Sequence, residues 1–274
     1  MMLTAHIGIV TEDSKIKPPE LVKVAAALQK QVTRDFGPLW NVNANVSAFT
    51  SLDDLPLDYW PVIIKDDIGD PSAAGYHDDQ RGQPFSLVQY SQGWSITASH
   101  EVLEMLADPF GRRLVAGPSP VTGQGRVKFL VEVCDPCEGD KFSYTVNGVR
   151  VSDFYTPHYF DPVKSEGVRY CYSGVIHEPR QVKKGGYLTW FNNQTRTWWQ
   201  RTWFGSKPTD GEIKDLQVEN GNVRAAIDRT TAKERMKVMA LRKPPAPAAR
   251  GTRAFSNRAQ DLRAAVARVT QQQR

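Results

Sequence analysis

Apolar residues recur at intervals of three and four positions between Leu21 and Phe36, with basic residues on the opposite face. This spacing predicts an amphipathic helix, because side chains three and four positions apart lie on one helix face. A pair of prolines before Glu20 favours the first helical turn, and Gly37 followed by a proline predicts the end of the helix. Short apolar or alternating runs predict four nearby strands, at residues 6–10, 42–49, 60–65 and 85–90.

A second helix is predicted over residues 96–107, with Ser95 as its N-cap and Pro109 ending it. The strand just before this helix, at residues 85–90, is expected to lie at the edge of its sheet. The first half of the chain is therefore predicted to run strand, helix, strand, strand, edge strand and helix.

The second half of the chain has the pattern of a mostly β region. The dipeptide Asn147-Gly148 predicts a tight hairpin, and two aromatic segments, 154–160 and 198–204, are expected to be loops. Short β-prone runs lie at residues 126–133, 142–146, 149–152, 168–172 and 186–191. The whole chain is therefore expected to be an α+β protein.

Length and charge predict a folded region followed by a basic C-terminal tail. For 274 residues, we expect an α/β subdomain over 1–115, a β-rich subdomain over 116–205 that completes a cleft, and a linker with a basic flexible tail over 206–274. Residues 231–274 hold 11 Lys/Arg against 2 Asp/Glu, whereas residues 1–230 hold 24 against 28. The tail is therefore expected to contact an acidic protein or a nucleic-acid surface, or to serve solubility alone.

The composition is that of an ordinary soluble protein, with 40% hydrophobic and 24% charged residues. There is no apolar run of the roughly 18–20 residues that a membrane span needs, and no signal peptide pattern at the start. A cytoplasmic location is the default expectation, with non-classical export or incorporation into a larger assembly as alternatives. No pattern indicates an oligomeric state.

The predicted helix at 96–107 carries its strongly polar residues in one stripe. At about 100° per residue, His100, Glu101, Glu104 and Asp108 fall within an arc of roughly 100°, and the stripe contains no lysine or arginine. Most of the remaining surface is apolar, interrupted by Ser99, so the helix is expected to be buried on most sides. Carboxylates in such a place need a cation, a proton or water to be tolerated.

A single divalent metal ion is the simplest cation that could neutralise the carboxylates of this stripe. His100 and Glu104, four residues apart, project side by side like the two histidines of His-Glu-x-x-His metallohydrolases. Glu101 lies next to them and is expected to be the general base that takes a proton from a metal-bound water. Zn²⁺, or another divalent ion such as Mn²⁺, is the expected cofactor.

The third metal ligand must come from elsewhere in the chain. Glu132, at the end of the strand predicted over 126–133, is the expected ligand. The alternates are Asp108 and Asp135. Asp108 lies on the stripe but ~12 Å along the helix axis from His100, which is too far without a bend, and it is expected to serve instead as a cap or to orient neighbouring groups.

These residues carry a resemblance to a known family. The order strand, backing helix, strands and His-Glu helix is similar to the N-terminal subdomain of zincin metallopeptidases. The His-Glu-Val-Leu-Glu sequence at 100–104 and the Glu-Val-Cys-Asp sequence at 132–135 resemble the His-Glu-x-x-Glu and later Glu-x-x-Asp elements of bacterial zincin-like proteins and plant phosphate-induced (EXORDIUM-like) proteins. The resemblance covers about residues 1–140.

The resemblance implies a zincin-like subdomain, with a twisted mixed sheet, a backing helix and an active-site helix, and the activity of a zinc-dependent metallopeptidase. Glu104 departs from ordinary zincins, which have a second histidine there. A carboxylate donates negative charge to the metal, so the bound water is expected to be less acidic.

An enzyme of this kind would attack a peptide carbonyl. The strand at 85–90 is expected to bind an extended peptide or protein substrate by strand addition. Tyr155, His158 and Tyr159, which lie in a predicted aromatic loop, are the expected donors to the oxyanion. His77 is expected to lie in a loop, either at the cleft or, as is more common for a lone loop histidine, as an ordinary surface residue.

Two alternatives remain open. Cys134 and Cys137 could form a structural zinc site with Cys171 and His177, act as a redox pair, or simply be buried, and Cys137 could form a disulfide with Cys171 in an oxidising environment. Alternatively, the protein is a non-catalytic scaffold or assembly protein whose basic tail and tryptophans make the contacts. Those tryptophans are Trp198, Trp199 and Trp203.

Overall fold

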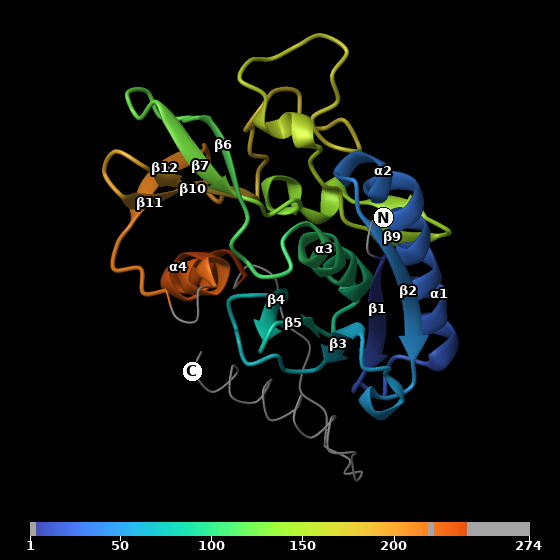
Figure 1. Ribbon diagram of the computed structural model, residues 1–274. Coiled ribbons are helices and arrows are strands. Elements are labelled where there is room, and N and C mark those ends of the chain that lie inside the picture. Colours follow the sequence, from blue (N-terminus) through green and yellow to red (C-terminus); the bar gives the residue numbers. More distant parts are fainter. Residues whose placement is uncertain (1–3, 219–221, 240–274) are drawn as a thin grey trace.

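A computed structural model describes residues 4–218 and 222–239 (Figure 1). Within these ranges the chain forms two five-stranded sheets, a two-stranded hairpin and the helices between them. The α+β class predicted from the sequence is confirmed. None of the described helices is both long and apolar enough to cross a membrane. Most of the predicted basic tail, from residue 240 onward, lies outside the described residues.

The first sheet has the strand order β2-β1-β3-β5-β4, with β4 antiparallel to β5 and the other pairs parallel. The prediction that residues 85–90 form an edge strand is wrong, because β4 covers β5 on that side. A turn at Arg81 and Gly82, both with positive φ, folds β4 against β5. The strands are β1 (Thr4–Thr11), β2 (Asn43–Phe49), β3 (Tyr59–Lys65), β4 (Gly75–Gln80) and β5 (Gln83–Gln89).

The first helix continues further than its sequence pattern predicts. α1 (Pro18–Lys30) runs into a π-helix, η1 (Gln31–Phe36), and then into α2 (Gly37–Trp40), so the predicted end at Gly37 is wrong. Pro38 is tolerated because it falls in the first turn of α2, where its missing N–H costs nothing. The chain instead leaves the helix at Asn41, which has a left-handed backbone.

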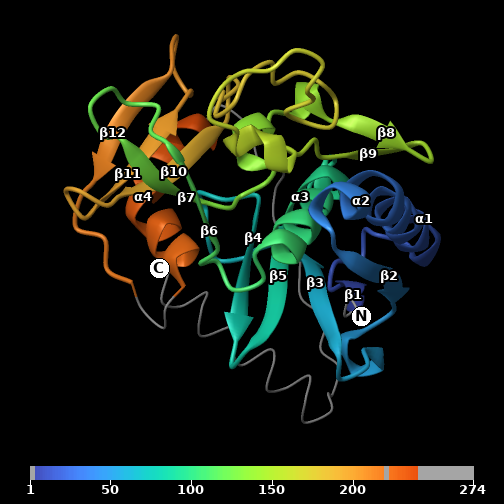
Figure 2. The ribbon, with the colours of Figure 1, turned by 45° about the horizontal axis from the view of Figure 1, so that its top comes forward.

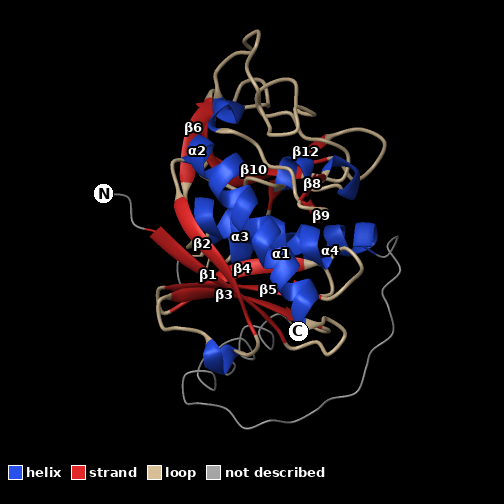
Figure 3. Ribbon diagram, turned by 90° about the vertical axis from the view of Figure 1, so that its right-hand side faces the viewer, coloured by secondary structure: helices blue, strands red, loops and turns tan. Residues whose placement is uncertain are grey.

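The second predicted helix is α3 (Trp94–Ala107), and it packs on β3, β4 and β5. Figure 3 shows α1 and α3 over the same face of the first sheet. The predicted N-cap at Ser95 is wrong: the helix begins after Gly93, and the Ser95 hydroxyl donates to the carbonyl of Arg150.

The second sheet is antiparallel, with the order β12-β11-β10-β7-β6. The strand predicted over 126–133 ends at Leu130, and residues 168–172 contribute only an isolated bridge between Cys171 and Tyr155. The segment 198–204, predicted as a loop, lies mostly in a strand. The strands are β6 (Leu114–Pro118), β7 (Arg126–Leu130), β10 (Tyr187–Asn192), β11 (Thr197–Thr202) and β12 (Thr209–Ile213).

Two further elements complete the fold. The predicted hairpin is confirmed as β8 (Tyr144–Val146) and β9 (Val149–Val151), with positive φ at Asn147 and Gly148. Helix α4 (Val223–Met239) forms inside the segment predicted as linker and tail. Figures 1 and 2 show α4 beside β4 and the second sheet. The core is largely continuous from α1 and α3 to the second sheet, which places α3 at the centre of the molecule.

Candidate metal centre

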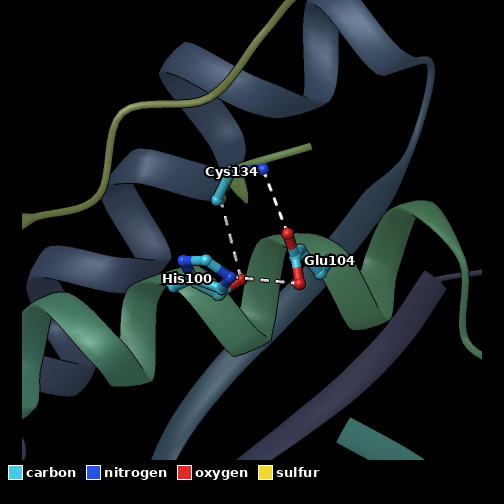
Figure 4. Close-up of side chains that lie close together, drawn as sticks. All are labelled: His100, Glu104 and Cys134. Carbon is cyan, nitrogen blue, oxygen red and sulfur yellow. Dashed lines mark hydrogen bonds and ion pairs between the residues drawn. The ribbon is translucent and has the colours of Figure 1, made fainter. Parts of the chain in front are cut away.

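His100 and Glu104 lie side by side on α3, as their spacing predicts (Figure 4). His100 Nε2 is 3.2 Å from Glu104 Oε2, and the Glu104 side chain is fully buried. Burial alone would raise the pKa of Glu104, but the charges of His100 and Arg224 outweigh it and hold that pKa far below its ordinary value. Glu104 is therefore a carboxylate, the form that binds cations.

The segment after β7 is fastened to α3 beside these two residues. The backbone N–H of Cys134 donates to Glu104 Oε1 at 3.1 Å, and the Cys134 thiol donates to the carbonyl of His100 at 3.8 Å. These two bonds fix the position of the next residue, Asp135. Its Oδ1 lies 3.3 Å from His100 Nε2. Cys134 itself, with His100 and Glu104, forms one of the groups that could hold a metal ion.

Asp135 has the surroundings of a metal ligand. The residue is buried, and neither carboxylate oxygen accepts a hydrogen bond from the described residues. Burial and the neighbouring Glu104 raise the pKa of Asp135 to about 8. With metal–ligand bonds near 2.1 Å, neighbouring ligands of a tetrahedral zinc ion lie about 3.4 Å apart. The separations of His100 from Glu104 and Asp135 match that geometry.

Glu132 and Asp108, the other candidates for third ligand, both have protein partners. Glu132 lies in the same cluster as Glu104 and Asp135, but its Oε2 accepts from Arg224 Nε at 2.7 Å. Asp108 directly follows α3, and its Oδ2 accepts from the backbone N–H of Arg113 at 2.6 Å in the loop after the helix. Asp135, the alternate, is thus better placed to bind a metal than Glu132.

Arg224 is the residue of the site that sequence reasoning missed. It enters from α4, is buried, and pairs with Glu132 at 2.7 Å and with Glu104 at 3.3 Å. Its Nη1 donates to the backbone carbonyl of His77 at 3.2 Å. The only feature of the sequence that indicates a buried helix face here is the pair of apolar residues Ala226 and Ile227. Both belong to α4 and are buried.

Glu101 lies on the other edge of the polar face of α3 and is close to the charged side chains around Glu104 and Arg224. Its Oε2 lies 3.5 Å from His77 Nδ1 and 3.8 Å from Arg224 Nη2, without a hydrogen bond to the described residues. His77 is buried on β4, so the interpretation of this residue as part of an exposed surface loop is wrong. Its Nε2 lies 3.1 Å from the carbonyl of Asp108, which can only accept, so this nitrogen carries a hydrogen.

The predicted oxyanion donors have three different surroundings. Tyr155 is fully buried, and its hydroxyl has no hydrogen-bond partner among the described residues. Burial, Tyr159 and Glu132 raise the pKa of Tyr155, so its hydroxyl keeps the proton that a donor needs. Tyr159 donates to the carbonyl of Gln181. His158 lies at the surface, with Nδ1 2.9 Å from Asp161 Oδ2.

The cysteine alternatives find no support in the geometry. All three cysteines are free and buried. Among the described residues, the groups that could hold a metal ion include neither Cys137, Cys171 nor His177. Burial raises the pKa of Cys134 and of Cys137, which opposes the thiolate that redox chemistry requires.

A pocket opens onto the candidate metal centre. His100, Glu101 and Asp135 form part of its wall, and Gly75, at the start of β4, lies on another side. A Cβ at Gly75 would lie 2.6 Å from Thr97 Cγ2 and 3.0 Å from Glu101 Oε1, so this position allows β4 to approach α3 closely.

Comparison of the chain with protein-family models, curated proteins and solved structures finds no match. The functional argument therefore depends on the fold and on the geometry of this site.

Proposed function

We propose that the protein is a metal-dependent hydrolase of zincin-like architecture, with His100, Glu104 and Asp135 as the metal ligands. The observation that carries this proposal is the position of His100 Nε2, within 3.3 Å of two buried carboxylates that come from different elements. Asp135 replaces Glu132 as the third ligand because Arg224 already binds Glu132. A mixed sheet with an antiparallel edge strand, backed by α1 and α3, supports the zincin-like part of the proposal.

The residues around the metal centre have separate roles in the proposed reaction. A bound divalent ion would polarise a carbonyl and make a bound water more acidic. Glu101 holds the proton during the reaction, because its carboxylate belongs to the pocket lining and its Oε2 accepts no hydrogen bond from the described residues. The Tyr155 hydroxyl, which has no hydrogen-bond partner among the described residues, is the proposed donor to the developing oxyanion. His158 is not needed in this scheme.

A peptide is the substrate class that the fold favours. The edge strand of the first sheet is β4, and its first residue, Gly75, lines the pocket. A peptide could extend the sheet there by main-chain hydrogen bonds. Further along β4 the carbonyl of His77 is already bound by Arg224, so strand addition is limited to the beginning of the strand.

Cleavage of a peptide mixture by the zinc-loaded protein, followed by mass spectrometry, tests this function. Glu101→Gln is expected to lower the cleavage rate about a hundredfold or more while the zinc content stays unchanged, because general bases contribute about that much. The double variant Glu166→Gln/Glu212→Gln changes two exposed carboxylates and serves as the control. Equal rates in wild type and Glu101→Gln would contradict the proposed role, and zinc without any cleavage would favour a non-catalytic scaffold.

A further inference from the structure

One carboxylate beside the candidate metal centre has no role in the proposed reaction. Glu138 directly follows the 3₁₀-helix η3 (Asp135–Cys137), and its backbone keeps a right-handed helical conformation. In a 3₁₀-helix, side chains three positions apart eclipse one another. Asp135 and Glu138 have this spacing, so the turn projects both carboxylates to the same side.

The distances place Glu138 at the metal centre itself. One ligand atom from each of His100, Asp135 and Glu138 lies within 4.8 Å of the other two. Asp135 is buried, its carboxylate accepts no hydrogen bond from the described residues, and its Oδ1 is 3.3 Å from His100 Nε2. A buried carboxylate this close to a second one needs a cation, a proton or water nearby. A divalent ion held by His100 and Asp135 is therefore within reach of Glu138.

Cys134 is the other residue near His100 that could supply a fourth ligand. Its sulfur, with His100 and Glu104, also belongs to a group close enough to share an ion. However, the Cys134 thiol donates to the carbonyl of His100 at 3.8 Å, so binding a metal through sulfur would cost this contact and a proton. Glu138 is half-buried and lies in the lining of the pocket, to which Cys134 does not belong. Glu138 is thus better placed for an ion that enters from the pocket.

We infer that Glu138 is a fourth protein ligand of the metal centre and that it adapts the centre to Mn²⁺. The inference rests on the proposed function, since it completes the ligand set of the same site. One imidazole and three carboxylates form a donor set rich in oxygen, which suits Mn²⁺ better than Zn²⁺. Four protein ligands would also fill a tetrahedral zinc site, whereas an octahedral ion keeps positions open for water and substrate.

Equilibrium dialysis of the metal-free protein against Mn²⁺ or Zn²⁺, followed by elemental analysis, tests the inference. Glu138→Gln is expected to weaken Mn²⁺ binding at least about tenfold, because even residues that only orient metal ligands contribute that much. Zn²⁺ binding should weaken less, since a catalytic zinc ion needs only three protein ligands. The unfolding midpoint of the metal-free protein should stay unchanged, because the substitution keeps the shape of a half-buried side chain.

Asp140→Asn is the matched control. Asp140 lies in the same pocket lining and its substitution removes the same charge, but Asp140 belongs to none of the possible metal-binding groups among the described residues. This variant should bind Mn²⁺ nearly as tightly as wild type. Equal weakening in Glu138→Gln and Asp140→Asn would mean a general effect of charge at the pocket and overturn the ligand role.

Two further variants distinguish a metal ligand from a residue that only positions its neighbours. Bound Mn²⁺ relaxes the protons of its exchanging water, and at saturating Mn²⁺ this relaxation should rise in Glu138→Ala, where water takes the vacated position. Unchanged relaxation would overturn direct binding by Glu138. Glu138→His supplies an imidazole, so it should restore a fourth ligand and shift the preference toward Zn²⁺.

The outcomes separate this inference from the proposed function. Equal Mn²⁺ affinity in wild type and Glu138→Gln would overturn the fourth ligand and leave the three-ligand centre standing. Equal weakening of Mn²⁺ and Zn²⁺ binding would support the ligand and overturn the adaptation to Mn²⁺. A metal that depends on Glu138 in a protein that cleaves no peptide would support the ligand and contradict the hydrolase, and a wild-type protein that binds neither ion would overturn both.

Discussion

A single arginine neutralises much of the buried negative charge beside the candidate metal centre. Arg224 contacts Glu132, Glu104 and Glu101, and its side chain is only 5% exposed. Removing one member of a buried ionic network leaves the others uncompensated, which costs far more than the intact network contributes. Arg224 therefore allows the fold to tolerate its carboxylates before a metal binds.

Arg224→Met is expected to destabilise the metal-free protein by about 3–5 kcal/mol. Zinc should recover part of this loss, because Glu132 and Glu104 are then free to attract the ion, so the variant should bind zinc more tightly than wild type. Urea unfolding with and without zinc measures both effects, with the exposed Arg112→Met as control. A variant that binds zinc more weakly would show that Arg224 supports the metal site rather than competing with it.

The sequence predicted those parts of the site that depend on one helix. His100, Glu101 and Glu104 share a helix face, so their spacing alone places them together. The choice between Glu132 and Asp135 depends on the path of the chain after β7, which hydrogen bonds from Cys134 decide. Partners from remote elements, such as Arg224, have no local pattern at all.

At the scale of elements, the π-helix η1 joins α3 to the hairpin. Gln31, fully buried in η1, accepts from the Ser99 hydroxyl at 2.7 Å and donates to the carbonyl of Ser152 at 2.9 Å. This contact explains why Ser99 interrupts the apolar side of α3. Near the end of η1, Asp35 accepts from the hydroxyls of Tyr144 and Tyr172.

The stability contributed by Asp35 should depend on pH. Burial alone would raise the pKa of Asp35, but hydrogen bonds from Arg34, Tyr172 and Tyr144 outweigh it and hold the pKa below its ordinary value. A lowered pKa in the folded state adds stability above about pH 4, and this stability is lost as the pH falls through the folded-state value.

Asp35→Asn is therefore expected to cost roughly 1–3 kcal/mol at pH 7, the penalty for leaving buried donors poorly satisfied. The difference from wild type should shrink as the pH falls below about 4. Denaturant unfolding from pH 7 to pH 3 measures it, with Asp58→Asn, whose side chain is 68% exposed, as the control. A difference that is constant over this range would rule out a charged Asp35 as its cause.

The predicted elements were mostly correct where the apolar pattern was strong. β1, β3 and α3 follow such patterns, whereas β4 is polar at four of six positions and was expected to be a loop. Polar residues are typical of an edge strand, which has solvent on one side. The sequence therefore predicted the centre of the first sheet but not which strand forms its edge.

At the scale of the whole molecule, α4 connects the C-terminal part of the chain to the site. It contributes Arg224 to the cluster, while Ala226 and Ile227 are buried beside it. A chain ending at residue 239 keeps this helix, and one ending at residue 218 lacks it. Only the shorter chain is expected to have a lower unfolding midpoint and to lose its zinc, because only this chain exposes the carboxylates that α4 covers. Equal stability of the two chains, measured by thermal unfolding, would contradict a structural role for α4.

The metal content of the purified, untagged protein tests the central claim most directly. Elemental analysis should find about one zinc or manganese ion per chain, as a single three-ligand site requires. This metal should be lost in His100→Ala and in Asp135→Asn, and kept in Glu132→Gln and in the double variant Cys134→Ser/Cys137→Ser. A protein without metal, or one that loses it only with the cysteines, would contradict the metal centre proposed at His100.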